Sequence, residues 1–295
     1  MSKKELVNKI EYYSFRAWLA GFKLLPRFVV RYLLISLFHT VGYGIGIRKQ
    51  IALKQLRQVY PNTPLSELKV ILKKMYRNMA LTVLEEYLTD DEQLYSMCKI
   101  TGREYVDEAL SLGRGAILAT AHFGNWEAAR ILPKAGIPLS VIAKAQRNNL
   151  FDTYTNDIRK RCGLKVIDMN KGLRDIIKQL NEGRFVAILM DQNAGKSGLM
   201  MDFLGFSASH WKGVAKISLR YGIPIVPGFA RRTDDGEIIF EFHKPILHVE
   251  LDDQEPNYRI VLEEVNQIIE KEIRMYPDQW FWVHKRWKHG FDMFA

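Results

Sequence analysis

A histidine and a glutamate five positions apart could together support acid–base chemistry. His122 and Glu127 bound the segment HFGNWE. Histidine titrates near neutral pH, and a carboxylate on its second ring nitrogen fixes the tautomer and stabilises the imidazolium that forms. Such a base lets a hydroxyl group attack a thioester directly, so acyl transfer needs no serine or cysteine nucleophile. Taken alone, the spacing favours a structural histidine and a glutamate that stabilises a helix N-terminus, because such pairs also occur by chance.

Other catalytic patterns are missing from the sequence. There is no HExxH pair with a third ligand, no G-x-S-x-G elbow, no Walker A segment and no GxGxxG loop. Cys98 and Cys162 form no CxxC pair, which argues against a thiolate metal site or a disulfide scaffold and fits a reducing, cytoplasmic setting. We therefore expect neither a metal ion nor an organic cofactor.

The candidate residues need a strand and a helix to position them. The apolar run Ala116–Ala121 predicts a buried strand that ends just before His122. A helix is expected to begin at Gly124-Asn125, with Glu127 in its first turn, so that this turn can bring Glu127 onto the imidazole. Asp191 follows another apolar run, and function in open α/β sheets gathers where strands end and helices begin.

From about residue 100, short apolar runs alternate with helical stretches. This alternation predicts an α/β fold with a mixed, largely parallel central sheet flanked by helices. The expected strands are 116–121, 139–143, 165–167, 186–190, 225–230 and 238–242, and the expected helices are 127–132, 150–161, 173–181, 212–221 and 256–275.

Residues 48–99 predict a helical lead-in to this α/β domain. The pattern is helical from Ile47 to Tyr60. A second helix is expected to run to about Tyr87, with Thr63 as its cap and Pro64 at its first helical position. We therefore predict two parts, a membrane-associating helical segment over residues 1–47 and an α/β domain over residues 48–295.

The first 47 residues are apolar and carry cations but few anions, without the pattern of a secretory signal. The uncharged run Tyr32–Ile47 falls short of the ~20 residues of a spanning helix, and a tilted span whose flanking arginines reach the interface is one alternative. Arg16, Lys23, Arg27 and Arg31 would share one sector of a single helix, as in a helix lying in the interface of an anionic membrane. Pro26 would kink or break that helix, and the alternative is helices that pack on the rest of the protein.

The net charge of +10 over 295 residues indicates an anionic partner, which could be nucleic acid, an acidic protein or anionic lipid. No RNA-recognition, zinc-finger or helix-turn-helix pattern accompanies this charge, so we expect no nucleic-acid partner.

Several motifs together resemble one enzyme family. The segment 122–127 looks like the HX4D/E signature of the glycerolipid and lipid A acyltransferase superfamily. Three further segments resemble its lipid A branch: 190–205 (MDQNAGKSGLMMDFLG), 222–232 (GIPIVPGFARR) and 277–288 (PDQWFWVHKRWK). The resemblance covers nearly the whole chain. The sequence is thus similar to the lipid A biosynthesis late acyltransferase family, the lauroyl/myristoyl branch of the lysophospholipid acyltransferase superfamily.

The resemblance implies roles for individual residues. It makes His122 the general base and Glu127 the carboxylate that orients it. Arg159 matches a position at which the branch carries a functionally important arginine, although it could also be a surface cation on a helix. Substrate-binding roles are implied for Asn125, Arg147, Asn149, Asp191 and Gln192.

The same resemblance implies acyl transfer from acyl carrier protein, or CoA, to a hydroxyl of a lipid A precursor. The reaction would take place at the cytoplasmic face of the inner membrane, where a basic protein face suits an anionic glycolipid, an anionic membrane surface and an acidic carrier protein. The cations and tryptophans of residues 280–288 could belong to that face or to the core.

Departures from the family pattern leave the acceptor open. The chain lacks the FPEGTRS block of the phosphatidic-acid-forming branch, and Glu127 favours a lipid A or mannolipid-like branch. Residues 208–211 (ASHW) stand where the branch often has Ala-Ser-Thr. The alternatives are an acyltransferase for another membrane lipid, such as a mannolipid or an aminolipid, and a non-catalytic membrane-binding homologue.

Overall fold

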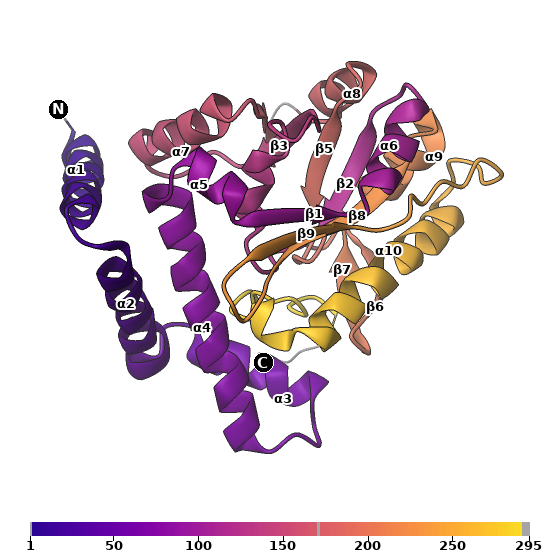
Figure 1. Ribbon diagram of the computed structural model, residues 1–295. Coiled ribbons are helices and arrows are strands. Elements are labelled where there is room, and N and C mark those ends of the chain that lie inside the picture. The colour runs from indigo at the N-terminus through magenta and orange to yellow at the C-terminus, as the bar shows by residue number, and fades with distance from the viewer. Residues whose placement is uncertain (1, 170–171, 291–295) are drawn as a thin grey trace.

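A seven-stranded sheet forms the centre of the computed structural model, which describes residues 2–169 and 172–290 (Figure 1). The strand order is β1-β9-β8-β2-β5-β3-β4, and only the β8–β9 pair is antiparallel. The predicted mixed, largely parallel sheet is therefore confirmed. The strands are β1 (Cys98–Thr101), β2 (Ala116–Thr120), β3 (Leu139–Ala143), β4 (Lys165–Asp168), β5 (Phe185–Leu189), β8 (Ile225–Arg232) and β9 (Ile238–Phe242).

The sequence did not predict β1 or the separate hairpin of β6 (Leu199–Phe203) and β7 (Phe206–His210). β1 has only four residues, none of them fully buried, so it lacks the apolar run that marks the other strands. The hairpin turns at Leu204-Gly205, where both residues have positive φ. Leucine seldom adopts this conformation, so the turn had no local signature.

Alternate residues of the strands enter two separate cores, one on each face of the sheet. Ile117 and Ala119 belong to a core formed with α3 (Lys49–Val59), α4 (Leu65–Leu88), α8 (Leu173–Asn181), α9 (Gly213–Tyr221) and α10 (Glu255–Met275). Ala116 and Leu118 belong to a core formed with α5 (Asp91–Ser96), α6 (Arg103–Ser111) and the 3-10 helix η2 (Trp126–Ile131). We call these the α8 face and the η2 face. α7 (Asn149–Arg161) follows β3 in the chain.

The long helix α4 begins one residue later than predicted. Pro64 occupies the cap position, and Thr63 does not cap the helix. Proline at this position already has the backbone angle that leads into the helix and has no N–H that needs a partner, so no side-chain cap is used.

The N-terminal region forms two helices, α1 (Lys3–Lys23) and α2 (Arg27–Phe38), and α2 continues into the π-helical segment η1 (His39–Ile45). Pro26 separates α1 from α2, as expected, so the predicted cationic stripe on a single helix is wrong. Arg16 lies over the ring of Tyr154 in α7, and Arg27 donates to Thr89. Both cations thus contact the body of the protein.

One face of α2 packs on α4, beside which it lies in Figure 1, through Val30, Leu34 and the α4 residues Ala80, Leu81 and Leu84. The other face leaves large side chains such as Phe28 and Tyr32 exposed. By length and composition the helix Arg27–Ile45 could cross a membrane, and most of it is not buried within the protein. Core helices and signal sequences pass the same test.

Candidate active site

His122 lies directly beyond β2, at the carboxyl edge of the parallel strands. The turn that follows closes tightly against β8, since Asn125 N–H donates to the carbonyl of Ala230 at 2.8 Å. Gly124 has a φ of +54°, and a Cβ there would lie 2.0 Å from the same carbonyl oxygen. Only glycine fits this position. The HFGNWE segment is therefore a sharp turn whose shape depends on its third residue.

Asn125 joins this turn to the helix that follows and to α4. Its Oδ1 accepts from the N–H of Ala128 and caps η2, while its Nδ2 donates to Oε2 of Glu85 at 2.6 Å. Glu85 forms a buried ion pair with Arg232 of β8. Asn125 is itself buried and lies outside the cavity described below, so the structure places it in the scaffold of the turn.

The carboxylate that contacts the imidazole of His122 belongs to Asp191, not to Glu127. His122 Nδ1 lies 2.9 Å from Asp191 Oδ1. The indole N–H of Trp280 donates to the other oxygen of Asp191 at 2.8 Å. The prediction that the helix turn brings Glu127 onto the imidazole is wrong, because the short 3-10 helix η2 directs the Glu127 side chain toward Arg159 of α7. The histidine and its carboxylate thus come from the ends of two strands, where the sequence analysis expected function to gather.

Each member of this pair shifts the pKa of the other. Burial alone would lower the pKa of His122, but the charge and hydrogen bond of Asp191, with a further contribution from Glu127, leave it raised above its usual value. Burial alone would raise the pKa of Asp191, but the interactions with His122 and Trp280 leave it lowered. The ion pair therefore holds a carboxylate that stays charged next to an imidazole that binds a proton more readily than usual.

Glu127 instead pairs with Arg159 of α7, and the distance from Arg159 Nη2 to Glu127 Oε1 is 2.8 Å. Burial and the charge of Glu127 raise the pKa of the neighbouring Glu86 to about 8, so Glu86 is mostly protonated at pH 7. Burial would lower the pKa of Arg159, but Glu127 raises it overall. Arg159 is thus a half-buried partner of Glu127 rather than a free surface cation.

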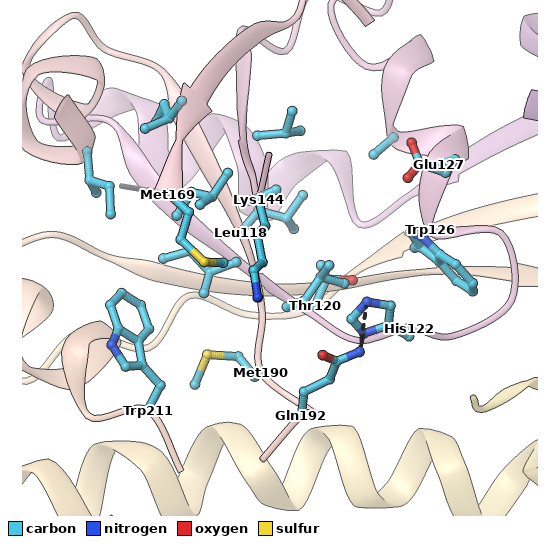
Figure 2. Close-up of a pocket in the computed structure, with 18 of the residues that line it drawn as sticks. Leu118, Thr120, His122, Trp126, Glu127, Lys144, Met169, Met190, Gln192 and Trp211 are labelled. Carbon is cyan, nitrogen blue, oxygen red and sulfur yellow. Dashed lines mark hydrogen bonds between the residues drawn. The ribbon is translucent and has the colours of Figure 1, made fainter. Parts of the chain in front are cut away.

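A cavity of about 760 Å³ opens beside His122. His122, Glu127, Arg159 and Gln192 all line it, and most of the remaining lining is apolar. Figure 2 shows the side-chain amide of Gln192 next to the imidazole, with its nitrogen 3.3 Å from His122 Nε2. The cavity is in the size range of small-molecule sites and is walled largely by hydrocarbon, which suits an apolar chain.

Some lining residues were not identified from the sequence, namely Thr120, Trp126, Lys144, Met169 and Trp211. Lys144 follows β3 as His122 follows β2, so the strand-end rule could have found it. Trp211 follows the hairpin whose strands were not predicted, and the only sequence signal for it was the departure of residues 208–211 from the family pattern.

Two predicted substrate-binding residues lie elsewhere. Arg147 and Asn149 are exposed around the start of α7 and do not line the cavity. Asn148 between them is buried and donates to the carbonyl of Asn8 in α1. The segment 147–149 therefore contacts the N-terminal helix α1. Its side chains are not in position to contact a substrate in the cavity.

The C-terminal segment 277–287 crosses the same edge of the sheet. Gly124 N–H donates to the carbonyl of Gln279, and Phe281 N–H donates to the carbonyl of His122. Four residues of this segment are buried, namely Trp280, Trp282, Trp287 and Arg286. They therefore belong to the core, as one of the two predictions had it, and not to a basic surface. Arg286 donates to the backbone carbonyl of Gln192, which fixes the loop that carries Asp191.

The chain is similar over residues 2–289 to the family described as bacterial lipid A biosynthesis acyltransferase. A lipid A biosynthesis acyltransferase of Haemophilus influenzae is 25% identical, over 82% of this chain and 76% of that protein. The lipid A biosynthesis lauroyltransferase of Escherichia coli is 23% identical over 92% of each chain. A phosphatidylinositol mannoside acyltransferase of Mycobacterium tuberculosis is 27% identical, over 43% of this chain and 42% of that protein.

Among solved structures, the 1-acyl-sn-glycerophosphate acyltransferase of Thermotoga maritima aligns with a TM-score of 0.39 and 15% identity. The alignment covers 84% of this chain and 97% of that one.

Proposed function

Since the chain belongs to the bacterial lipid A biosynthesis acyltransferase family, and is therefore an acyltransferase for a lipid acceptor, we propose that it moves a fatty acyl chain from acyl carrier protein, or from CoA, to a hydroxyl of a lipid A precursor. The observation that carries this proposal is the His122–Asp191 pair, whose histidine lines a largely apolar cavity.

In the proposed reaction, His122 acts as the general base. Asp191 accepts the hydrogen bond of Nδ1–H, so the lone pair of His122 is on Nε2, which removes the proton from the acceptor hydroxyl. The hydroxyl oxygen attacks the thioester carbonyl and forms a tetrahedral intermediate. When the carbon–sulfur bond breaks, the imidazolium returns the proton to the sulfur, and the ester and the free thiol leave.

Further residues have supporting roles in this scheme. Trp280 holds Asp191 in place by its N–H donor. The amide N–H of Gln192, next to the reacting nitrogen, is positioned to donate to the oxygen that becomes negative in the intermediate. The Glu127–Arg159 pair fixes the wall of the cavity on the opposite side of the turn.

The proposal retains the division into residues 1–47, a membrane-associating segment, and residues 48–295, the acyltransferase domain, with 48–99 as its helical lead-in. The exposed apolar side chains of α2, including Phe28, Tyr32 and Leu37, supply the surface that enters the lipid. The expected site of the enzyme is the cytoplasmic face of the inner membrane, where both the donor and the glycolipid acceptor are found.

The proposal is tested with purified protein, acyl donors of either kind and a lipid A precursor. Mass spectrometry should find one added acyl chain, and His122→Ala should remove the activity without changing the circular dichroism spectrum or the binding to vesicles. Near-normal turnover by His122→Ala would refute the role of the histidine. Turnover with acyl-CoA but not with the acyl carrier protein would identify CoA as the donor.

A second candidate is acylation of another membrane lipid, which the similarity to phosphatidylinositol mannoside acyltransferases supports. The lipids of a deletion strain distinguish the two, because loss of one acyl chain from lipid A supports the first and unchanged lipid A rejects it. A non-catalytic homologue is the remaining alternative. It would be favoured if the protein consumed no donor with any lipid acceptor tested.

A further inference from the structure

His210 lies where the chain departs from the family pattern. It is the third residue of the segment ASHW, where the lipid A branch often has Ala-Ser-Thr, and it is the last residue of strand β7. Its side chain is fully buried and does not line the cavity beside His122. A buried polar group needs hydrogen-bond partners to offset the loss of water. The partners of His210 therefore indicate what this residue does.

The main partner of His210 is Arg286. The Nη2 atom of Arg286 lies 2.9 Å from Nε2 of His210 and 3.1 Å from its Nδ1. A guanidinium group can only donate, so the imidazole must accept, and it must be neutral to do so. Burial and the charge of Arg286 lower the pKa of His210 to about 3, which keeps the ring neutral. From the other side, the Nδ2 atom of Asn266 in α10 lies 3.2 Å from Nδ1 and holds the ring in place.

Arg286 is buried without a carboxylate partner. In the part of the chain that the structure describes, no acidic residue forms an ion pair with it. Burial lowers the pKa of Arg286 to about 10, while the charges of Asp191 and Glu270 oppose this shift, so the guanidinium stays charged at neutral pH. A buried charge without a counter-ion depends on neutral hydrogen-bond acceptors. The acceptors of Arg286 are the ring of His210 and two backbone carbonyls.

The two carbonyls belong to the loop after β5 and to β7. Arg286 Nη1 donates to the carbonyl of Ser209 at 2.6 Å and to the carbonyl of Gln192 at 3.3 Å. We call these two contacts the clamp. The hydroxyl of Ser209 also donates to the carbonyl of Gly195 at 2.6 Å. The loop is therefore fixed at residues 192 and 195 from the side of β7 and Arg286.

Gln192 connects the clamp to the reacting histidine. Its side-chain nitrogen lies 3.3 Å from Nε2 of His122, and Figure 2 shows the amide beside the imidazole. The backbone of Gln192 sets the point from which this side chain reaches His122. The clamp acts on that backbone, so a change in the orientation of Arg286 would move the amide.

We propose that His210 is a positioning residue, which accepts a hydrogen bond from Arg286 and so orients the guanidinium that clamps Gln192 and places its amide at His122. This rests on the proposed acyl transfer, in which the amide donates to the oxygen that becomes negative. A carboxylate in place of His210 would form a charged, bidentate pair with Arg286 and draw the guanidinium away from the carbonyls. A neutral ring leaves the guanidinium able to donate to all three acceptors.

His210→Phe removes the acceptor and keeps a ring at this position. It should lower kcat by about 10- to 100-fold, less than the loss of a whole oxyanion donor, with KM for both substrates changed by less than about twofold. His210→Gln, whose amide oxygen can accept from Arg286, should recover most of kcat. The matched control is His243→Phe, since His243 is a partly buried histidine outside the cavity, and kcat should not change. Wild-type kcat in His210→Phe would overturn the proposal.

A double-mutant cycle tests the path through Gln192. Gln192→Ala should lower kcat at least as much as His210→Phe. The two changes together should be little worse than Gln192→Ala alone, because both remove the same interaction. If the two losses multiplied, His210 would act independently of Gln192 and the proposal would be overturned.

The variant His210→Phe/Arg286→Met separates positioning from folding. Either single change leaves a buried group without its partner and should lower the unfolding temperature, whereas apolar side chains at both positions should recover most of the loss. Positioning predicts that kcat stays low in the double variant, because nothing then holds the carbonyl of Gln192. A kcat that recovered together with the unfolding temperature would show a purely structural role and overturn the proposal.

Hydrogen exchange tests the clamp without turnover. The backbone N–H groups of residues 193 and 194 donate to His284 and to the carbonyl of Ser209. They should exchange faster in His210→Phe than in the wild type, but not in His243→Phe. Unchanged exchange in His210→Phe would overturn the proposal. A wild-type protein that acylates no lipid would instead refute the proposed function, and the exchange rates would still decide whether His210 supports the clamp.

Discussion

Two ion pairs border the cavity, one through His122 alone and one through both of its members, with nearly equal contact distances but different chemistry. His122 and Asp191 meet at 2.9 Å at the ends of two strands, and Asp191 is only 3% exposed. Glu127 and Arg159 meet at 2.8 Å between η2 and α7, with side chains that are 19% and 18% exposed. The first pair contains an imidazole, which can take a proton from a hydroxyl group, while the second joins a carboxylate to a guanidinium. Distance therefore does not identify a catalytic base, but the ability to exchange a proton does.

The largest expected effect comes from the first pair. Asp191→Asn should reduce kcat by about 10²–10⁴-fold, comparable to the loss of general base catalysis, because the tautomer and orientation of His122 are no longer fixed. Steady-state kinetics with a single donor and acceptor measures this, and thermal unfolding provides the check on folding. If Asp191→Asn were as active as the wild type while Glu127→Gln was inactive, the roles assigned to the two pairs would be reversed.

A smaller loss is expected in the second pair. Arg159→Ala or Glu127→Gln should lower kcat/KM by about 10- to 100-fold, since a displaced cavity wall misplaces the substrate. The double variant should be little worse than either single one, because the residues act together. Glu86 limits the effect of Glu127→Gln, since its pKa of about 8 falls when Glu127 is neutral and it can then pair with Arg159. Glu86→Gln combined with Glu127→Gln should therefore be worse than Glu127→Gln alone.

The pH dependence of kcat/KM should also distinguish the two pairs, because only the first contains a histidine. His122 must be neutral to act as a base, so kcat/KM falls as the pH drops below its pKa. Because that pKa is raised, the acidic limb should lie above the usual 6.5. Asp191→Asn removes the main interaction that raises the pKa and leaves burial, which lowers it, so the limb should move to lower pH. A limb that stays in place in the residual activity of Asp191→Asn would contradict this account.

The smallest effect belongs to a pair outside the cavity. Lys99 and Glu237 meet at 2.8 Å on the surface, where the Lys99 side chain is 64% exposed and the Glu237 side chain 47% exposed. Lys99→Ala should leave kcat/KM unchanged and alter the free energy of unfolding by less than about 0.5 kcal/mol, since water screens exposed charges. If Lys99→Ala clearly lost activity, the losses in the other variants could be explained by the removal of any ion pair. The position of the pairs at the cavity would then not be the cause.

The sequence predicted the fold where signals were local. Strand β2 and helix α8 follow from apolar runs and helical periodicity, and the position of His122 follows from the end of β2. That Asp191 shares a cleft with His122 came from the family resemblance and from the rule about strand ends. The partner of His122 was assigned incorrectly, because the choice between Asp191 and Glu127 depends on the direction of a single 3-10 turn and on Trp280. Those contacts join residues up to 89 positions apart, so no local pattern records them.

The C-terminal segment 277–287 also determines when the enzyme can begin to work. Trp280 holds Asp191, Gln279 and Phe281 bond to the turn around His122, and Arg286 fixes the loop at Gln192. During translation these residues emerge from the ribosome long after β2 and β5 have been made. A nascent chain that already displays its apolar N-terminal helices therefore lacks the contacts that order the proposed His122–Asp191 pair, so this site is assembled only after its last residues have been made.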